Sequence, residues 1–148
     1  MLIAVCAPQS TPLAETEDGR ITAIMKLRHE RMKNELGKSL NLIDDEVHGA
    51  APDKAKIAEA AQILLTYSKE IPVWFPKGSG PETGWGLAKS EIWDKPDEFK
   101  AATARMIDTA GKLARAANTE QLPEITARFE AVAVECKGCH KAFRIPPT

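Results

Sequence analysis

The feature that most limits the fold is a helical repeat of mostly apolar side chains. From about residue 17 to 48, these side chains recur at spacings of three and four, which places them on one face of a helix. The stripe consists of Ile21, Met25, Arg28, Met32, Leu36, Leu40, Ile43 and Val47. Gly49 and Pro52 follow it and predict the end of this helix.

The same periodicity predicts three further helices, over about residues 53–70, 95–117 and 120–144. No segment shows the alternation that is typical of a strand, so the fold class is all-α. Four amphipathic helices with two short connections and one longer one predict an antiparallel up-down-up-down four-helix bundle.

The longer connection, residues 71–94, contains three prolines and four glycines. This composition ends helices and is typical of a long ordered crossover or a mobile loop. At its end, Asp94 is predicted to cap the third helix, because Asp is a preferred capping residue and Pro96 is tolerated in a first turn.

Length and charge exclude several classes of protein. The 148 residues are enough for one domain. The net charge is −1 and acidic and basic residues alternate along the chain, so there is no basic stripe for a nucleic acid. No apolar run approaches 18 residues, so no membrane span is expected.

Residues 1–16 differ in composition from the rest and are predicted to be a disordered leader or the remnant of an export signal, with the domain at 17–148. They begin apolar, become rich in Pro, Ser and Thr, and contain no basic residue before Arg20. Cys6 resembles the cysteine of a lipoprotein cleavage site, but Val5 is large for the position before it. An incidental cysteine is therefore favoured over a lipid anchor.

The fourth helix carries a C-x-x-C-H motif, formed by Cys136, Cys139 and His140, on its core-facing side. This spacing is the attachment signal of a c-type haem. Two thiols one helical turn apart can reach the two vinyl groups of one porphyrin edge, and the adjacent imidazole can bind the iron. The motif thus predicts one haem c, bound covalently through both cysteines.

Three alternatives to haem remain at this point. A thioredoxin-like C-x-x-C requires a preceding strand in a βαβ unit, which this chain lacks. A structural zinc site requires four ligands; the motif supplies three, and only His29, His48 or Cys6 could add another. Two chance core cysteines beside a surface histidine are the third alternative.

With this motif near its C-terminus, the chain resembles the cytochrome c-prime family, the class II c-type cytochromes. The resemblance covers about residues 18 to 145 and includes the segments "CKGCHKAFR", "IMKLRHERMKNELGKSL", "GSGPETGWGLAKSEIW" and "DEFKAATARM". It implies a four-helix bundle with haem in its core and a periplasmic location.

The resemblance also indicates which residue occupies the other side of the iron. In gas-binding members the corresponding position on the first helix holds a non-ligating residue, and in the low-spin branch it holds a methionine that binds iron. Here that position is Met25. Met32, two turns further along, and His29 are weaker candidates. For His29, the charged neighbours Arg28, Glu30 and Arg31 indicate a solvated face. Met25 as plain core filler remains the alternative.

Two further residues are implied by the resemblance. Arg144 follows His140 by four residues, where the family places an arginine near the haem; pairing with the helix dipole is the alternative. Trp93 matches an aromatic residue that the family packs near the haem. The family also often has an arginine four residues before the distal position, but here that residue is Ile21 and Arg20 is out of register.

The favoured function is therefore that of an electron-transfer cytochrome and not an enzyme, with His140 and Met25 as axial ligands. Its partners would be other redox proteins, met through a small transient contact. A homodimer is left open. The alternative is a five-coordinate protein that binds nitric oxide or carbon monoxide, and a haem-independent helical adaptor is a distant third.

Overall fold

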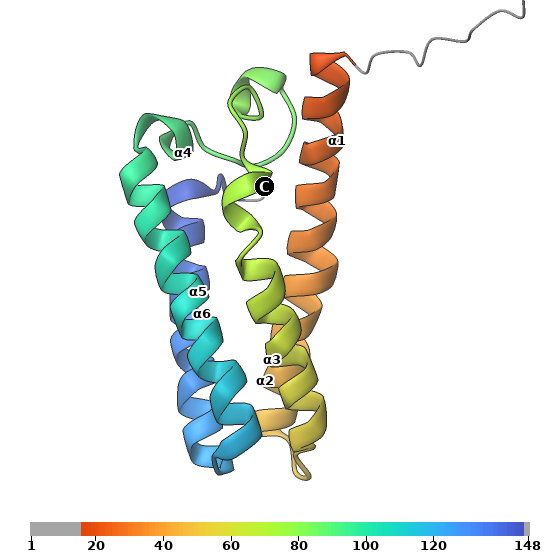
Figure 1. The fold of residues 1–148 in the computed structure, drawn as a ribbon, viewed down its shortest axis with the longest axis vertical. Helices are drawn as coiled ribbons and strands as arrows, with labels where there is room; N and C mark the ends of the chain where they lie inside the picture. The colour runs from red at the N-terminus through yellow and green to blue at the C-terminus, as the bar shows by residue number, and fades with distance from the viewer. Residues whose placement is uncertain (1–15, 147–148) are drawn as a thin grey trace, which may run out of the picture.

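Four long helices run antiparallel in the computed structural model, which describes residues 16–146 (Figure 1). The first comprises three consecutive segments and the other three are single helices. The elements are α1 (Glu17–Glu30), η1 (Arg31–Gly37), α2 (Lys38–His48), α3 (Lys54–Ser68), α5 (Pro96–Thr119) and α6 (Leu122–Phe143). The prediction of an all-α, up-down-up-down bundle is confirmed, and each predicted helix end lies within about three residues of the observed one.

Side-chain caps fix where the first and second long helices begin. The hydroxyl of Thr16 accepts a hydrogen bond from the backbone N–H of Gly19 at 3.2 Å. The carboxylate of Asp53 accepts from the backbone N–H groups of Ala55 at 3.0 Å and Lys56 at 3.2 Å. Each cap satisfies N–H groups that have no partner inside the helix.

The predicted cap at Asp94 is wrong. Asp94 is the last residue of a short helix, α4 (Glu91–Asp94), and the residue before α5 is Lys95, whose side chain makes no capping bond. The backbone N–H of Asp94 already bonds to the carbonyl of Ser90 at 3.0 Å, so Asp94 is held in a helical turn and not in the extended conformation of a cap. Pro96 does occupy the first turn of α5, as predicted.

The core is formed mainly where α5 packs against α6 and α3, and where α2 packs against α3. Its most deeply buried aliphatic side chains come from all four long helices. They are Ile43, Ile57, Leu64, Leu113, Ile125 and Val132. Full burial of one such side chain contributes about 1.5–3 kcal/mol, so this layer holds the lower part of the bundle together.

The middle of the first long helix, η1, is a π-helix, in which each N–H bonds five residues back. The carbonyl of Met32 comes within 3.2 Å of the point where a Cβ on Gly37 would lie, so glycine allows this close approach. A π segment rotates the side chains that follow it relative to an unbroken α-helix. It therefore changes which residues of this helix face the core.

The connection between α3 and α5 crosses one end of the bundle, at the top of Figure 1, and contains two turns of 3-10 helix, η2 (Ile71–Trp74) and η3 (Pro81–Thr83). It is anchored by buried side chains, Trp74 and Ser79 above all. Positive φ angles at Gly78, Gly84 and Gly86 account for much of its glycine content. The connection is therefore a folded crossover built around buried anchors.

The end of this crossover is joined to the end of α6. The backbone N–H of Ile145 donates to the carbonyl of Leu87 at 2.7 Å, and that of Lys89 donates to the carbonyl of Phe143 at 3.0 Å. Ala88 and Arg144 form an isolated antiparallel bridge between the two segments. These bonds fix the crossover over one side of the bundle.

Two sequence predictions concern parts of the chain outside this description. The leader, apart from Thr16, and Cys6 lie outside the described residues, so the proposed export signal and lipid anchor stay predictions. Between residues 16 and 146, no helix has both the length and the apolar character that a membrane crossing needs.

Candidate functional site

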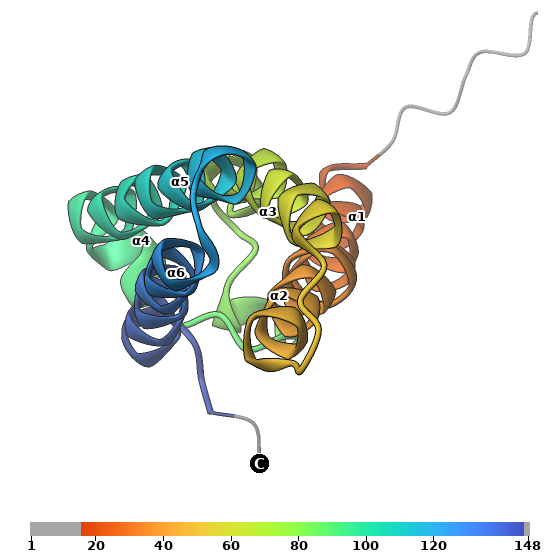
Figure 2. The same cartoon turned by 90° about the horizontal axis from the view of Figure 1, so that it is seen from below.

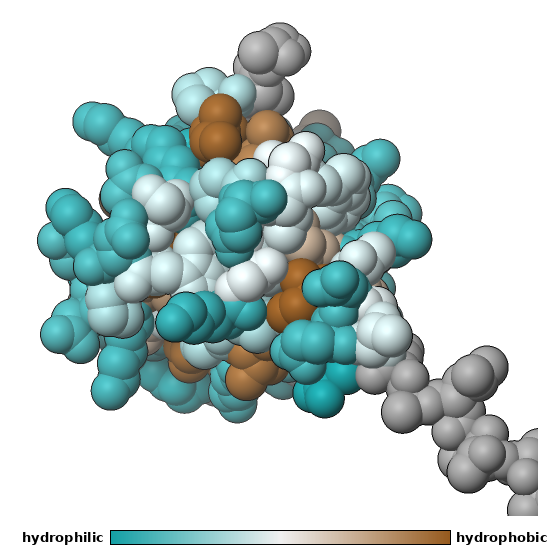
Figure 3. Space-filling view, turned by 90° about the horizontal axis from the view of Figure 1, so that it is seen from above, coloured by the Kyte–Doolittle hydropathy of each residue, from teal (hydrophilic) through white to brown (hydrophobic). Residues whose placement is uncertain are grey.

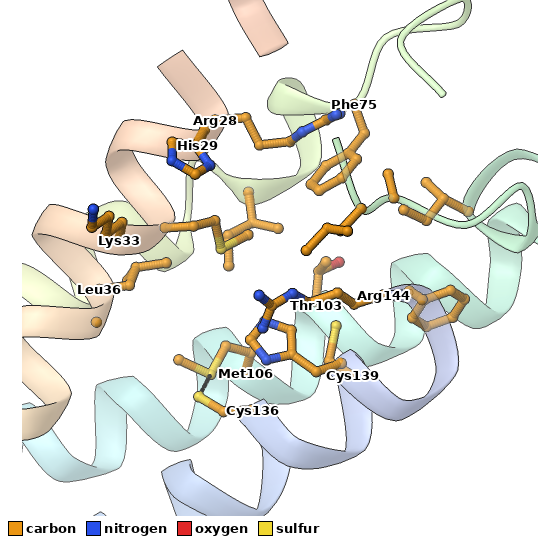
Figure 4. A pocket seen from close by; sticks show the side chains of 18 of the residues that line it. Arg28, His29, Lys33, Leu36, Phe75, Thr103, Met106, Cys136, Cys139 and Arg144 are labelled. Atoms are coloured by element: carbon orange, nitrogen blue, oxygen red, sulfur yellow. Dashed lines mark hydrogen bonds between the residues drawn. The ribbon is translucent and has the colours of Figure 1, made fainter. Parts of the chain in front are cut away.

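A cavity of about 800 Å³ lies between the first long helix and the α5–α6 pair, against the crossover (Figure 4). Beyond its own continuation, α1 packs mainly against η2, while α5 and α6 pack against each other. This arrangement leaves room between the two walls. The volume lies in the range of about 300–1,000 Å³ that is typical of cofactor pockets.

Cys136 and Cys139 lie on successive turns of α6 and line one wall of this cavity. Both side chains are half-buried, and the thiol of Cys136 donates to the sulfur of Met106 on α5 at 3.9 Å (Figure 4). Burial, together with the nearby Cys139 and Glu135, raises the pKa of Cys136 to about 11. Burial also raises the pKa of Cys139. At neutral pH both are therefore S–H groups that face an apolar space.

His140 lines the same wall, directly after Cys139. The side chain of His140 is still exposed to solvent, but its partial desolvation, followed by the positive charge of Arg144, lowers the pKa of its imidazole. A lowered pKa favours the neutral imidazole, which is the form that binds a metal. Cys136, Cys139 and His140 therefore lie on one face of α6, as predicted from their spacing.

The opposite wall is formed by the first long helix. Met25 on α1 is buried, with 3% of its surface exposed, and lines the cavity. Met32 and Lys33 on η1 and His29 on α1 line it as well. Figure 4 shows His29 and Lys33 on the first long helix, across the cavity from α6. The structure therefore brings the candidate distal residues and the C-x-x-C-H motif to one cavity.

Aromatic rings form part of the cavity wall at the crossover end. The rings of Phe75 and Phe99 meet edge to face with centroids 5.1 Å apart, and those of Phe99 and Phe143 with centroids 5.3 Å apart. All three line the cavity, and they come from the crossover, α5 and α6. Such a run excludes water from that side of the site.

The position predicted for one charged residue, Arg28, is wrong. The prediction of a solvated face around His29 included Arg28, yet Arg28 is buried, with 7% of its surface exposed, and lines the cavity. His29 itself is exposed, and its ring centroid lies 6.1 Å from that of Trp85. The place of Arg28 in the predicted stripe, three residues after Met25, was the signal that could have indicated its burial.

Arg144 and Trp93 occupy different positions relative to the cavity. Arg144 lines it at the end of α6, and its backbone N–H bonds to the carbonyl of His140 at 3.0 Å. Trp93 is not among the residues that line it; its indole nitrogen is 3.2 Å from the carbonyl oxygens of both Phe75 and Pro76, and its ring centroid is 6.3 Å from that of Phe75.

The charges around the cavity are mostly positive. The Lys, Arg and acidic residues that line it are Arg28, Lys33, Glu135, Lys137 and Arg144. The one carboxylate among them, Glu135, is paired with Arg105 outside the cavity at 3.1 Å. The site is therefore suited to a largely apolar group that carries negative charge at its edge.

These residues fit a haem. A haem is apolar over most of its surface and carries two carboxylates, and the cavity offers an apolar wall, thiols one turn apart, a neutral imidazole and unpaired cations. Among the described residues, no three His, Cys, Asp or Glu side chains gather in an arrangement that could hold a metal ion. The ligand set of a structural zinc is thus not assembled there.

Comparisons with known proteins identify the family of the chain. Residues 23–144 match the family described as "Cytochrome C'". Over 126 residues the chain is 31% identical to a cytochrome c-prime from Pararhodospirillum photometricum, which covers 82% of this chain and 96% of that one. It is 29% identical over 119 residues to a cytochrome c-556 from Agrobacterium tumefaciens, covering 80% and 94% of the two chains.

Solved structures agree with the fold. A nitric oxide complex of a variant of cytochrome c-prime from Alcaligenes xylosoxidans superposes with a TM-score of 0.77 at 28% identity, and covers 85% of this chain and 97% of that one. The similarity therefore extends over most of both chains and supports the four-helix fold.

Proposed function

Because the chain belongs to the cytochrome c-prime family, we propose that it is a periplasmic electron-transfer cytochrome in which His140 and Met25 bind the iron of one covalent haem. Proteins of this family are haem proteins and not enzymes. When bound, the haem supplies an iron that cycles between the ferric and ferrous states. The protein supplies attachment, axial ligands and protection from solvent.

Attachment is assigned to Cys136 and Cys139. Each thiol would add its sulfur and hydrogen across one vinyl group, which needs no oxidant and leaves a thioether. Burial keeps both thiols protonated until then, because it raises the pKa of each. Their spacing on α6 brings the imidazole of His140 to the same side of the cavity.

The observation that carries the proposal is the burial of Met25 in the wall opposite α6. A thioether in that wall can serve as the sixth ligand, and a methionine ligand raises the reduction potential of haem iron. The second methionine, Met32, is less buried and lies two residues after the end of α1, in the π segment. Its position supports its use as the matched control.

The experiment is the pair of variants Met25→Leu and Met32→Leu. Leucine conserves volume and apolarity, so each change should cost less than about 1.5 kcal/mol in the free energy of unfolding. Met25→Leu removes the sulfur and should give a high-spin haem with a lower reduction potential. Met32→Leu should leave the spectrum unchanged. A low-spin spectrum in Met25→Leu would exclude Met25 as the ligand.

A five-coordinate, gas-binding protein is the second candidate. It is favoured by the likeness to a structure described as a nitric oxide complex, and by the apolar side chains around Met25. In that case Met25 would be core filler and the distal side would remain open to nitric oxide or carbon monoxide. The relatives named cytochrome c-prime and cytochrome c-556 are similar to this chain to nearly the same degree.

Redox proteins are the proposed partners of the electron-transfer function. From the end of the bundle that carries the crossover, hydrophilic residues cover most of the surface, and hydrophobic residues form separate small patches (Figure 3). Such a surface is typical of brief encounters and not of a permanent complex. Figure 2, a view along the bundle from its other end, shows α3 lying between α2 and α5.

A further inference from the structure

Lysines from three segments lie around the opening of the cavity, and we call Lys33, Lys89, Lys137 and Lys141 the lysine rim. Lys33 on η1 and Lys137 on α6 line the cavity and are exposed to solvent, and Figure 4 shows Lys33 across the cavity from α6. Lys141 follows Lys137 by four residues, so both lie on one face of α6. The ammonium of Lys89, at the end of the crossover, donates to the carbonyl of Lys141 at 3.1 Å.

The lysine rim has no carboxylate partner within residues 16–146. None of the ion pairs formed there includes a rim lysine. The carboxylate in the cavity wall, that of Glu135, is paired with Arg105. Like charges four residues apart on a helix repel each other, so placing Lys137 and Lys141 together lowers stability slightly. The whole chain has a net charge of −1, so this positive charge is offset by negative charge elsewhere on the molecule.

Two structural causes account for only part of the lysine rim. The dipole of α6 favours cations in its last turn, which includes Lys141 but not Lys137. The two carboxylates of a bound haem can offset two of the four cations in the cavity wall, which are Arg28, Lys33, Lys137 and Arg144. Lys89 and Lys141 are not among the residues that line the cavity. The opening therefore stays positive when the haem is bound.

Exposed apolar side chains lie beside the lysine rim. Trp85, Leu87 and Ile145 are 47%, 37% and 40% exposed. Trp85 and Leu87 line the cavity from the crossover, and the backbone N–H of Ile145 bonds to the carbonyl of Leu87. Protein interfaces commonly have an apolar centre with a polar rim, and tryptophan is enriched among the residues that contribute most to binding. The opening has both parts of such an interface.

We propose that the partner of the electron-transfer function is a redox protein with an acidic surface, which docks on this opening. Its carboxylates would lie against the lysine rim, and an apolar side chain would lie against Trp85. The partner would accept one electron from ferrous iron, which leaves ferric iron, or donate one electron in the reverse step. This assignment rests on the proposed function and adds the charge of the partner and the place where it binds. Complementary charges speed the encounter and disfavour partners of the wrong sign.

An anionic membrane surface is the competing occupant, because it carries the same sign of charge as an acidic protein. Binding to a membrane depends on inserting an apolar face as well as on charge. Trp85, Leu87 and Ile145 offer only a small apolar surface, with part of each side chain buried in the protein. An acidic protein fits this combination of many charges and few apolar side chains better.

The first test measures how fast the ferrous, haem-loaded protein is oxidised by two small complexes of opposite charge, hexacyanoferrate(III) and tris(phenanthroline)cobalt(III). The rim variant Lys33→Gln, Lys137→Gln should react several-fold more slowly with the anion and faster with the cation at low salt, and high salt should remove both differences. The control Lys54→Gln, Lys112→Gln removes the same charge from residues that do not line the cavity, and it should change neither rate. The reduction potential of each variant is measured to correct for driving force.

The second test uses a poly-glutamate peptide as a probe for an acidic protein surface, with poly-lysine as its control. NMR spectra are recorded on the ferrous carbon monoxide complex, which is diamagnetic even if Met25 is not a ligand. Poly-glutamate should shift the indole N–H signal of Trp85 and the backbone signals around Lys137. The signal of Trp74, which is 1% exposed, should stay in place, and poly-lysine should shift none of these signals.

Three results would overturn the proposal. The first is equal rates for the rim and control variants with both oxidants; where Lys137→Gln impairs haem loading, Lys33→Gln with Lys141→Gln takes its place. The second is the absence of poly-glutamate shifts at Trp85 and Lys137. The third is that phosphatidylglycerol vesicles bind and shift these signals while poly-glutamate does not, which would identify a membrane as the occupant. A high-spin ferrous protein whose rates still depend on the lysine rim would count against the Met25 ligand alone.

Discussion

At the scale of single residues, the chemistry of the site depends on two thiols and an imidazole that line the cavity from consecutive turns of α6. Cys136, Cys139 and His140 needed only the geometry of one helical turn to be placed together. Arg28 needed more, because its acceptors at Trp74 and Ser79 lie 46 and 51 positions away. Nothing in the local pattern around Arg28 specified those partners.

The first prediction concerns the two cysteines. Treatment with acid and acetone should leave the haem on the protein, because thioethers do not break under these conditions. The double variant Cys136→Ala, Cys139→Ala should retain no haem after the same treatment. It should also be less stable, since a space of about 800 Å³ would remain between α1 and α6. The check is the haem absorbance of the aqueous and organic phases, and its complete extraction from the unmodified protein would refute covalent attachment.

At the scale of elements, periodicity predicted the four long helices, and it failed where helices change type. The π segment η1 has no signature in a single sequence, because its glycine and apolar residues also suit an α-helix. Lys33, on this segment, lines the cavity but was not a candidate, because it lies outside the predicted apolar stripe. The four-residue helix α4 was too short to show a period, which led to the wrong cap at Asp94.

The second prediction concerns the junction of α2 and α3. The carboxylate of Glu46 accepts from the backbone N–H of Asp53 at 2.7 Å and from the ammonium of Lys56 at 3.2 Å. These bonds, that to Asp53 first, lower the pKa of Glu46 in the folded protein. A lowered folded pKa gives stability that is present above the unfolded pKa of about 4.3 and is lost as the pH falls through the folded pKa.

Glu46→Gln should therefore lower the thermal midpoint at pH 7, and the difference from the unmodified protein should shrink as the pH falls below about 4. Glu59→Gln, which changes an exposed carboxylate on α3, is the control and should have little effect at either pH. Thermal unfolding at several pH values measures both. A difference for Glu46→Gln that stays constant from pH 7 to strong acid would contradict this account.

At the scale of the whole molecule, topology and the position of the haem motif could be predicted, but the cavity could not. Its size depends on how α1 is held away from α5 and α6 by η2 and the crossover, which is a matter of contacts between distant segments. Trp93 illustrates the limit, since its indole N–H bonds to the backbone carbonyls of Phe75 and Pro76, which lie 18 and 17 positions away. Which residue lies opposite His140 likewise depends on how the first long helix is placed relative to α6.

The central claim is that Met25 occupies the sixth position, and the most direct test is the rate at which the ferrous protein binds carbon monoxide. If Met25 is bound to iron, the spectrum before mixing should be low-spin, and binding should be slow with a rate that levels off at high carbon monoxide, because loss of Met25 comes first. A high-spin ferrous protein that binds at once, with a rate proportional to carbon monoxide, would contradict the claim and favour the gas-binding function.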